Sequence, residues 1–83
     1  MDAELNALSL TVGEALTAHG WMLATAESCT GGWVAEAVTA ISGSSAWFDR
    51  GFVTYSNSAK VDILGVSPAT LATAGAVSEA TVA

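Results

Sequence analysis

The sequence predicts an α/β fold, in which helical segments alternate with two short strands. Apolar residues recur at helical spacing over residues 3–19 and again from Val34 to Ile41. Two shorter segments, Trp21 to Ala26 and Gly51 to Tyr55, have the length and composition of strands. A turn of small and polar residues follows each of these segments and leads into a helical pattern, which is the alternation typical of the α/β class.

The first helix is expected over about residues 3–19. Its apolar stripe consists of Leu5, Leu8, Val12 and Leu16. Asp2 can cap the start, and Gly20 fits the C-terminal stop. The apolar run from Trp21 to Ala26 comes next, and its length favours a buried strand over a helix.

The second helix is expected around the stripe of Val34, Ala37, Val38 and Ile41, and residues 42–45 (Ser-Gly-Ser-Ser) break it with turn chemistry. The second strand then covers Gly51 to Tyr55. The tryptophans are expected mostly in the core, although one of them can instead cover a flat ring in a pocket: Trp21, Trp33 and Trp47.

Three short helices are expected in the last third of the chain. Asn57 can cap a helix that runs through Lys60 to Leu64 and stops at Gly65. Ser67 with Pro68 begins another, which Gly75 closes, and Ser78-Glu79 starts a last helix of about one turn. A lone turn and two strands are marginal by themselves. We therefore expect residues 1–83 to be the N-terminal portion of a single domain, with more chain normally following.

Net charge, cysteine count and apolar run length exclude several classes of function. The chain has 83 residues and a formal net charge of −6, with Arg50 and Lys60 as its only fixed cations, which argues against nucleic-acid binding. Cys29 is the only cysteine, so neither an intrachain disulfide nor a structural zinc site is expected. There is no signal peptide and no apolar run long enough for a membrane span, so we expect a cytoplasmic protein that does not enter a membrane.

The strongest local feature is the turn Ser28-Cys29-Thr30-Gly31-Gly32, between the first strand and the second helix. Ligands of α/β proteins commonly bind where strands end. The first N–H groups of a helix are unpaired and can hold a phosphate or a developing oxyanion. Ser28 is then placed to act as a nucleophile. The alternative is that Ser28 merely caps the helix, as serine often does.

A serine nucleophile needs a base. The only histidine, His19, is expected at the exposed end of the first helix, where its charge suits the helix dipole. Lys60, the only lysine, can replace histidine if burial keeps it partly neutral. The alternative is a solvated lysine on a helix surface. Tyr55 can relay a proton or orient a substrate, or it can be a core aromatic.

Other side chains near these segments allow two interpretations each. Ser44 and Ser45 can add hydroxyl donors, or they can be plain turn residues. Cys29 can be a nucleophile at a helix start, or it can be a small buried residue.

Five segments in order resemble the CinA C-terminal domain family (competence/damage-inducible protein). They are residues 25–32 (TAESCTGG), 43–45 (GSS), 51–60 (GFVTYSNSAK), 64–66 (LGV) and 75–79 (GAVSE). The resemblance implies a layered α/β/α fold. Family domains continue beyond the length of this sequence, so the phosphate-binding residues are expected in a part that it does not include.

The resemblance also implies an activity. Amidase members of the family hydrolyse the carboxamide of nicotinamide mononucleotide, giving nicotinate mononucleotide and ammonia, and so salvage pyridine nucleotide for NAD synthesis. The family's proposed dyad matches Ser28 as nucleophile and Lys60 as general base. Tyr55 and Ser45 match further active-site positions for proton relay and orientation. We expect Thr30, Gly31 and Gly32 to bind substrate, the backbone near Thr30 and Gly31 stabilising the oxyanion, with no metal or other cofactor.

Two other functional readings stay open. The chain can be a non-catalytic nucleotide-binding or regulatory module linked to competence or DNA damage, in which the helix start at Gly31-Gly32 binds a phosphate and Lys60 stays charged. It can also be a structural fragment with unpaired strand edges that promote association. Under all of these readings a homo-oligomer is plausible, because so small a fold has apolar surface to cover.

Overall fold

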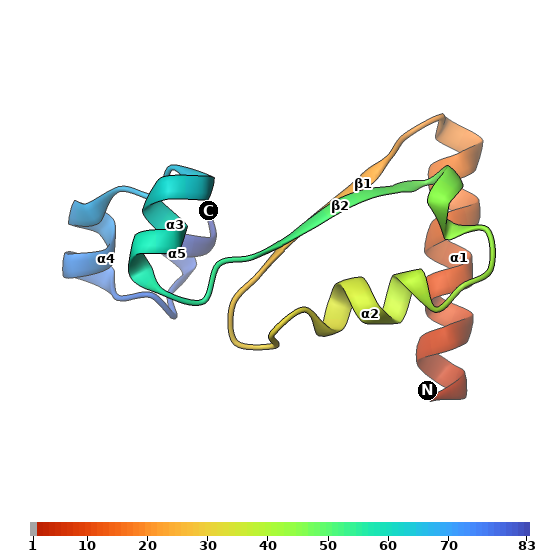
Figure 1. Cartoon of the computed structure of the whole chain (residues 1–83), viewed down its shortest axis with the longest axis horizontal. Coiled ribbons are helices and arrows are strands. Elements are labelled where there is room, and N and C mark those ends of the chain that lie inside the picture. The colour runs from red at the N-terminus through yellow and green to blue at the C-terminus, as the bar shows by residue number, and fades with distance from the viewer. Residues whose placement is uncertain (1) are drawn as a thin grey trace. The chain divides into compact units, whose positions relative to one another are not determined.

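The structure, a computed structural model, describes residues 2–83 (Figure 1). The chain divides into two compact units, one ending at Val53 and the other spanning Thr54–Ala83. The first unit contains α1 (Ala3–His19), β1 (Leu23–Glu27), α2 (Trp33–Thr39), the 3₁₀ helix η1 (Ser44–Ala46) and β2 (Phe48–Val53). The second contains α3 (Asn57–Leu64), α4 (Pro68–Ala74) and α5 (Glu79–Val82). No helix among residues 2–83 is long and apolar enough to cross a membrane.

The predicted ends of α1 are confirmed. The Asp2 carboxylate accepts hydrogen bonds from the backbone N–H groups of Glu4 (2.7 Å) and Leu5 (3.1 Å), which satisfies donors that the helix leaves unpaired. At the other end Gly20 has a φ of 67°, the left-handed conformation that glycine adopts most readily. Both ends are therefore set by residues next to the helix in sequence.

The buried face of α1 differs from the predicted leucine stripe. Ser9 and Gly13 are the buried residues of this helix, whereas Leu8 is 59% exposed. The cause is the indole of Trp47, which lies so close to the α1 backbone that a Cβ at Gly13 would stand 2.5 Å from its Cε2 atom. Only a face of small side chains allows this approach.

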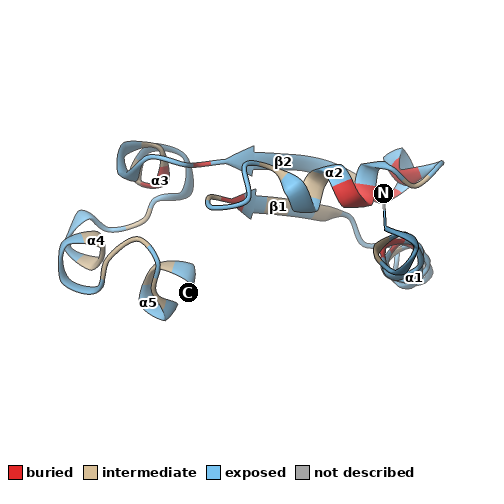
Figure 2. Ribbon diagram, turned by 90° about the horizontal axis from the view of Figure 1, so that it is seen from below, coloured by how far each residue is buried: buried red, intermediate tan, exposed pale blue. Residues whose placement is uncertain are grey.

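The expectation that the tryptophans are mostly core residues is correct only for Trp47, which is 5% exposed and, with Ala37 and Val38, is one of the buried apolar residues. Trp21 and Trp33 are 64% and 51% exposed. The Trp21 ring instead stacks on the imidazole of His19, with ring centroids 4.7 Å apart. Figure 2 shows how little of the ribbon is buried, with the buried segments in red.

Strands β1 and β2 form a parallel pair, which confirms the α/β prediction. β2 begins three residues earlier than predicted, at Phe48, and ends at Val53, so Tyr55 lies outside the strand. The charged side chains of Asp49 and Arg50 obscured this start in the sequence. They are tolerated because both are exposed and pair with each other, at 2.6 Å between carboxylate and guanidinium.

The register brings the carboxyl ends of the two strands together, with Glu27 opposite Val53. Helix α2 packs on one face of the pair (Figure 2), where a Cβ at Gly51 would contact the Cβ of Ala35 at 3.4 Å. The alternating residues Ala24 and Ala26 are exposed. Helix α2 therefore forms a helical layer on one face of the two strands.

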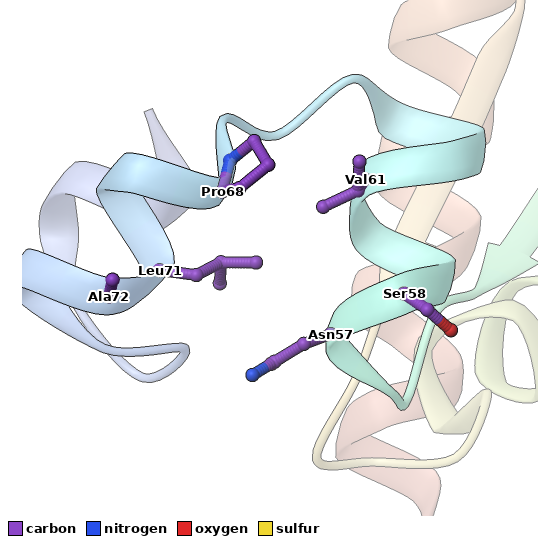
Figure 3. A pocket seen from close by; sticks show the side chains of 6 residues that line it. All are labelled: Asn57, Ser58, Val61, Pro68, Leu71 and Ala72. Atoms are coloured by element: carbon purple, nitrogen blue, oxygen red, sulfur yellow. The ribbon is translucent and has the colours of Figure 1, made fainter.

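Helix α3 begins one residue earlier than predicted. Its cap is Ser56, not Asn57, because the Ser56 hydroxyl accepts a hydrogen bond from the Ala59 N–H at 3.1 Å. Gly65 ends the helix as expected, with a φ of 69°. The side chains of Val61, Pro68 and Leu71 point into a shallow depression between α3 and α4 (Figure 3).

The last two helices begin where the sequence predicted. Pro68 is the first residue of α4, although the Ser67 side chain makes no capping hydrogen bond. The single turn of α5 is held by hydroxyl groups: those of Ser78 and Thr81 both donate to the Gly75 carbonyl oxygen at 2.8 Å. Ser78 also accepts from the Thr81 N–H at 3.2 Å, so side-chain hydrogen bonds stabilise a turn too short to be stable alone.

Candidate active site

The loop that carries Ser28 starts directly at the carboxyl end of β1. Ser28 is half-buried, and its carbonyl oxygen accepts a hydrogen bond from the Gly31 N–H at 3.3 Å. Gly31 and Gly32 have φ values of 66° and 105°, which side chains rarely allow. The two glycines therefore give the loop its sharp return into α2.

The alternative reading of Ser28 as a helix cap is wrong. The residue at the cap position of α2 is Gly32, which has no side chain to accept a hydrogen bond. The carboxylate of Glu27 takes over this role from the end of β1. Its Oε1 accepts from the Val34 N–H (2.6 Å) and its Oε2 from the Ala35 N–H (3.0 Å).

Three backbone donors at or near this helix start are thus already used within the chain. Val34 and Ala35 donate to Glu27, and Gly31 donates to Ser28. A carboxylate at a helix N-terminus is stabilised by the helix dipole, and it repels a second anion placed there. The geometry consequently disfavours a phosphate at the start of α2.

Glu27 is the residue that the sequence reasoning missed. It is buried, with 8% of its surface exposed, and it also accepts a hydrogen bond from the Thr30 hydroxyl at 2.7 Å. Burial raises the pKa of this carboxyl, but the bonds from Thr30, Val34 and Ala35 outweigh burial and leave the pKa lower than usual. Capping rules look at the residue just before a helix, whereas Glu27 caps across a loop of five residues.

Lys60 lies in the middle of α3 and is 5% exposed, so the alternative of a solvated surface lysine is wrong. Its Nζ atom donates a hydrogen bond to the backbone carbonyl oxygen of Tyr55, at 2.8 Å. The side chain therefore folds back toward the start of its own helix. Tyr55 is 72% exposed, so the alternative of a core aromatic is also wrong.

The two remaining hydroxyl candidates lie in η1, where Ser44 is buried and Ser45 is exposed. Since η1 precedes β2 and the strands are parallel, Ser45 lies at the opposite end of the sheet from Ser28. The first unit does not bring these two serines together, and substrate binding by Ser45 stays a prediction. The thiol of Cys29 is exposed, which excludes the alternative of a small buried residue.

The candidate residues are divided between the units. Ser28 and the Thr30–Gly32 turn belong to the first, and Tyr55 and Lys60 belong to the second. A Ser28–Lys60 dyad thus joins residues of both units and stays a prediction. Within the first unit, Ser28 directly follows the carboxyl end of β1, which is where α/β proteins commonly bind ligands.

Comparison with known proteins agrees with the sequence resemblance. The family model of the CinA C-terminal domain matches residues 5–83. The nicotinamide-nucleotide amidohydrolase PncC of Escherichia coli (strain K12) is 64% identical over 78 residues, covering 94% of this chain and 47% of that protein. A CinA-like protein of Chloroherpeton thalassium is 60% identical over 70 residues, covering 84% of this chain and 17% of that protein.

Solved structures show the same fold. The competence/damage inducible protein CihA from Agrobacterium tumefaciens superposes with a TM-score of 0.94 at 52% identity, over 98% of this chain and 49% of that one. The competence damage-inducible protein A from Klebsiella pneumoniae gives 0.91 at 49% identity, over 94% and 48%. The chain spans about half the length of the amidohydrolases it matches. It belongs to the CinA C-terminal domain family.

Proposed function

We propose that this chain is part of an amidohydrolase that converts nicotinamide mononucleotide to nicotinate mononucleotide and ammonia, for pyridine nucleotide salvage. The observation that carries the proposal is the 64% identity to proteins named nicotinamide-nucleotide amidohydrolase, extending over 94% of this chain. The position of Lys60 supports it, because this lysine stands where the family's proposed base does and its side chain is buried and not solvated.

In the proposed reaction, Ser28 attacks the carboxamide carbon while Lys60 accepts the hydroxyl proton. A neutral amine keeps two N–H donors and one lone pair, so Lys60 can donate to the Tyr55 carbonyl and still accept this proton. The new bond joins the Ser28 Oγ to the carbonyl carbon. The C–N bond then breaks, and ammonia leaves with the proton returned from Lys60. Water finally hydrolyses the ester and releases nicotinate mononucleotide.

The same proposal gives roles to Tyr55 and to the Thr30–Gly32 turn. Tyr55, whose side chain is exposed, relays a proton or orients the substrate. The Thr30–Gly32 turn binds the carboxamide end, and the oxyanion takes N–H groups of this turn other than the one that Gly31 donates to Ser28. No step requires a cofactor or a metal.

Phosphate binding is assigned to residues other than those at the α2 start. Within residues 2–83, the Arg50 guanidinium pairs with Asp49 and the Lys60 Nζ atom contacts the Tyr55 carbonyl. The donors for the phosphate are then expected in the portion of the relatives' length that this chain does not span. We propose further that residues 1–83 form part of a single domain, and that the protein is a cytoplasmic homo-oligomer that binds neither nucleic acid nor membranes.

The rival reading, a non-catalytic module that binds a nucleotide phosphate at Gly31-Gly32, is disfavoured by one observation. The Glu27 carboxylate already occupies the N–H groups of Val34 and Ala35. A bound phosphate would have to displace this carboxylate or lie beside it, and both arrangements are electrostatically unfavourable.

The test is ammonia release from nicotinamide mononucleotide by a protein extended to the length of the relatives. Ser28→Ala and Lys60→Met should each lower kcat by about 10³-fold or more, as expected for members of one catalytic unit. Ser42→Ala, at an exposed turn serine of the same unit, is the matched control and should leave kcat unchanged. Substantial activity in both site variants, with normal folding by circular dichroism, would exclude the dyad.

A further inference from the structure

Glu27 is the only buried carboxylate among residues 2–83. Burying an ionised carboxylate is unfavourable unless hydrogen bonds compensate for the lost water. A helix start can be capped more simply by an exposed serine or aspartate at the cap position itself. Here that position is Gly32, whose φ of 105° suits glycine, and the cap comes from the strand end instead.

The contacts of Glu27 link the end of β1, the Ser28–Gly32 loop and the start of α2. Its backbone ends β1, where it pairs with Val53. Its Oε1 accepts from the Thr30 hydroxyl in the middle of the loop, and both carboxylate oxygens hold the first turn of α2. The loop from Ser28 to Gly32 is therefore closed at both ends and tied at its centre by one side chain.

We propose that Glu27 is a positioning residue, which sets the geometry of the Ser28 loop through Thr30 and the start of α2. This inference rests on the proposed function, in which Ser28 is the nucleophile. Glu27 is bonded to its neighbours in the protein and not to substrate. Its removal lets the loop and the first turn of α2 separate, and Ser28 then samples orientations that cannot attack. A misplacement of about 1 Å at a reacting group can cost about 10²-fold in rate.

To distinguish a positioning role from direct substrate binding, the experiment uses Glu27→Gln in the extended protein. The glutamine amide keeps one oxygen acceptor for Thr30 and Val34, but its NH₂ group cannot accept from the Ala35 N–H. We expect kcat to fall by about 10- to 100-fold with KM changed by less than about threefold, because positioning acts on attack and not on binding. Glu36→Gln removes an exposed carboxylate in the first turn of α2 and is the matched control, with both constants unchanged.

Amide hydrogen exchange gives a readout that does not depend on turnover. In Glu27→Gln the Ala35 N–H should exchange at least about tenfold faster than in the unsubstituted protein, and the Leu5 N–H, capped by Asp2 in α1, should not change. If the unsubstituted protein releases no ammonia, the proposed function fails, and the exchange data alone show whether Glu27 holds the loop.

The inference is overturned if Glu27→Gln keeps full kcat, or if KM rises in proportion to the loss of kcat/KM, which would indicate direct contact with substrate. Should this variant fail to fold, Thr30→Val takes its place, since it removes only the hydroxyl that donates to Glu27. A lowered kcat with unchanged KM in Thr30→Val, restored in Thr30→Ser, supports positioning. An unchanged kcat in Thr30→Val overturns it.

Discussion

Replacement of Gly13 by alanine tests the packing of α1 directly. Gly13 is buried in the middle of the helix, and an added Cβ would lie 2.5 Å from Cε2 of Trp47 and 2.7 Å from both Cζ2 and Nε1. Favourable carbon–carbon contact begins at about 3.5 Å. The methyl group would therefore overlap the indole by about 1 Å, and it meets a rigid ring that is itself buried.

Two opposing contributions decide the change in the free energy of unfolding. Alanine is favoured over glycine inside a helix by about 1 kcal/mol. Overpacking of a well-packed core costs about 1–3 kcal/mol. Because Trp47 is only 5% exposed, the ring cannot swing into solvent without losing its burial, so the upper part of this range applies. We expect Gly13→Ala to be destabilising by about 1–2 kcal/mol.

Urea unfolding followed by circular dichroism measures this change. A double-mutant cycle with Trp47→Leu isolates the steric contribution, because leucine has none of the three indole atoms that the methyl group meets. In the Trp47→Leu background, Gly13→Ala should be neutral or stabilising. Stabilisation by Gly13→Ala in the unsubstituted background would refute the packing of Gly13 against Trp47.

Three other outcomes are expected. Because the pKa of Glu27 is lowered by folding, its carboxylate stabilises the protein above the unfolded pKa, near 4.5, and this stabilisation is lost as pH falls through the folded pKa. Between pH 7 and pH 3, the free energy of unfolding in urea should therefore fall less in Glu27→Gln than in the unsubstituted protein. Ser56→Ala should cost about 1 kcal/mol by thermal melting, and Asn57→Ala clearly less, since Ser56 is the cap of α3. Gly32→Ala should destabilise by about 1–2 kcal/mol in the same assay, because its φ is 105°; equal stability would contradict that backbone conformation.

Features that depend on neighbouring residues could be predicted from the sequence. The ends of α1 follow from Asp2 and Gly20, whose bonds reach only two to four residues along the chain. The turn at Ser28–Gly32 and the stop at Gly65 are equally local, because a left-handed φ is a property of glycine itself. The ordered segments also indicated the family, which the family model confirms.

Other features depend on contacts between segments that are distant in sequence, and only the tertiary structure decided them. Periodicity marked Leu8 for the buried side of α1, but the approach of the Trp47 indole selected the small face of Ser9 and Gly13. The start of β2 depended on pairing with β1, which no single-strand pattern encodes. The burial of Glu27 and Lys60 likewise was not evident from the sequence: Glu27 accepts from residues seven and eight positions ahead in the next helix, and Lys60 donates to the carbonyl five positions before it. Local rules set where the helices begin and end, whereas strand pairing and the free energy of packing decide where β2 begins, which face of α1 is buried and which charged side chains are buried.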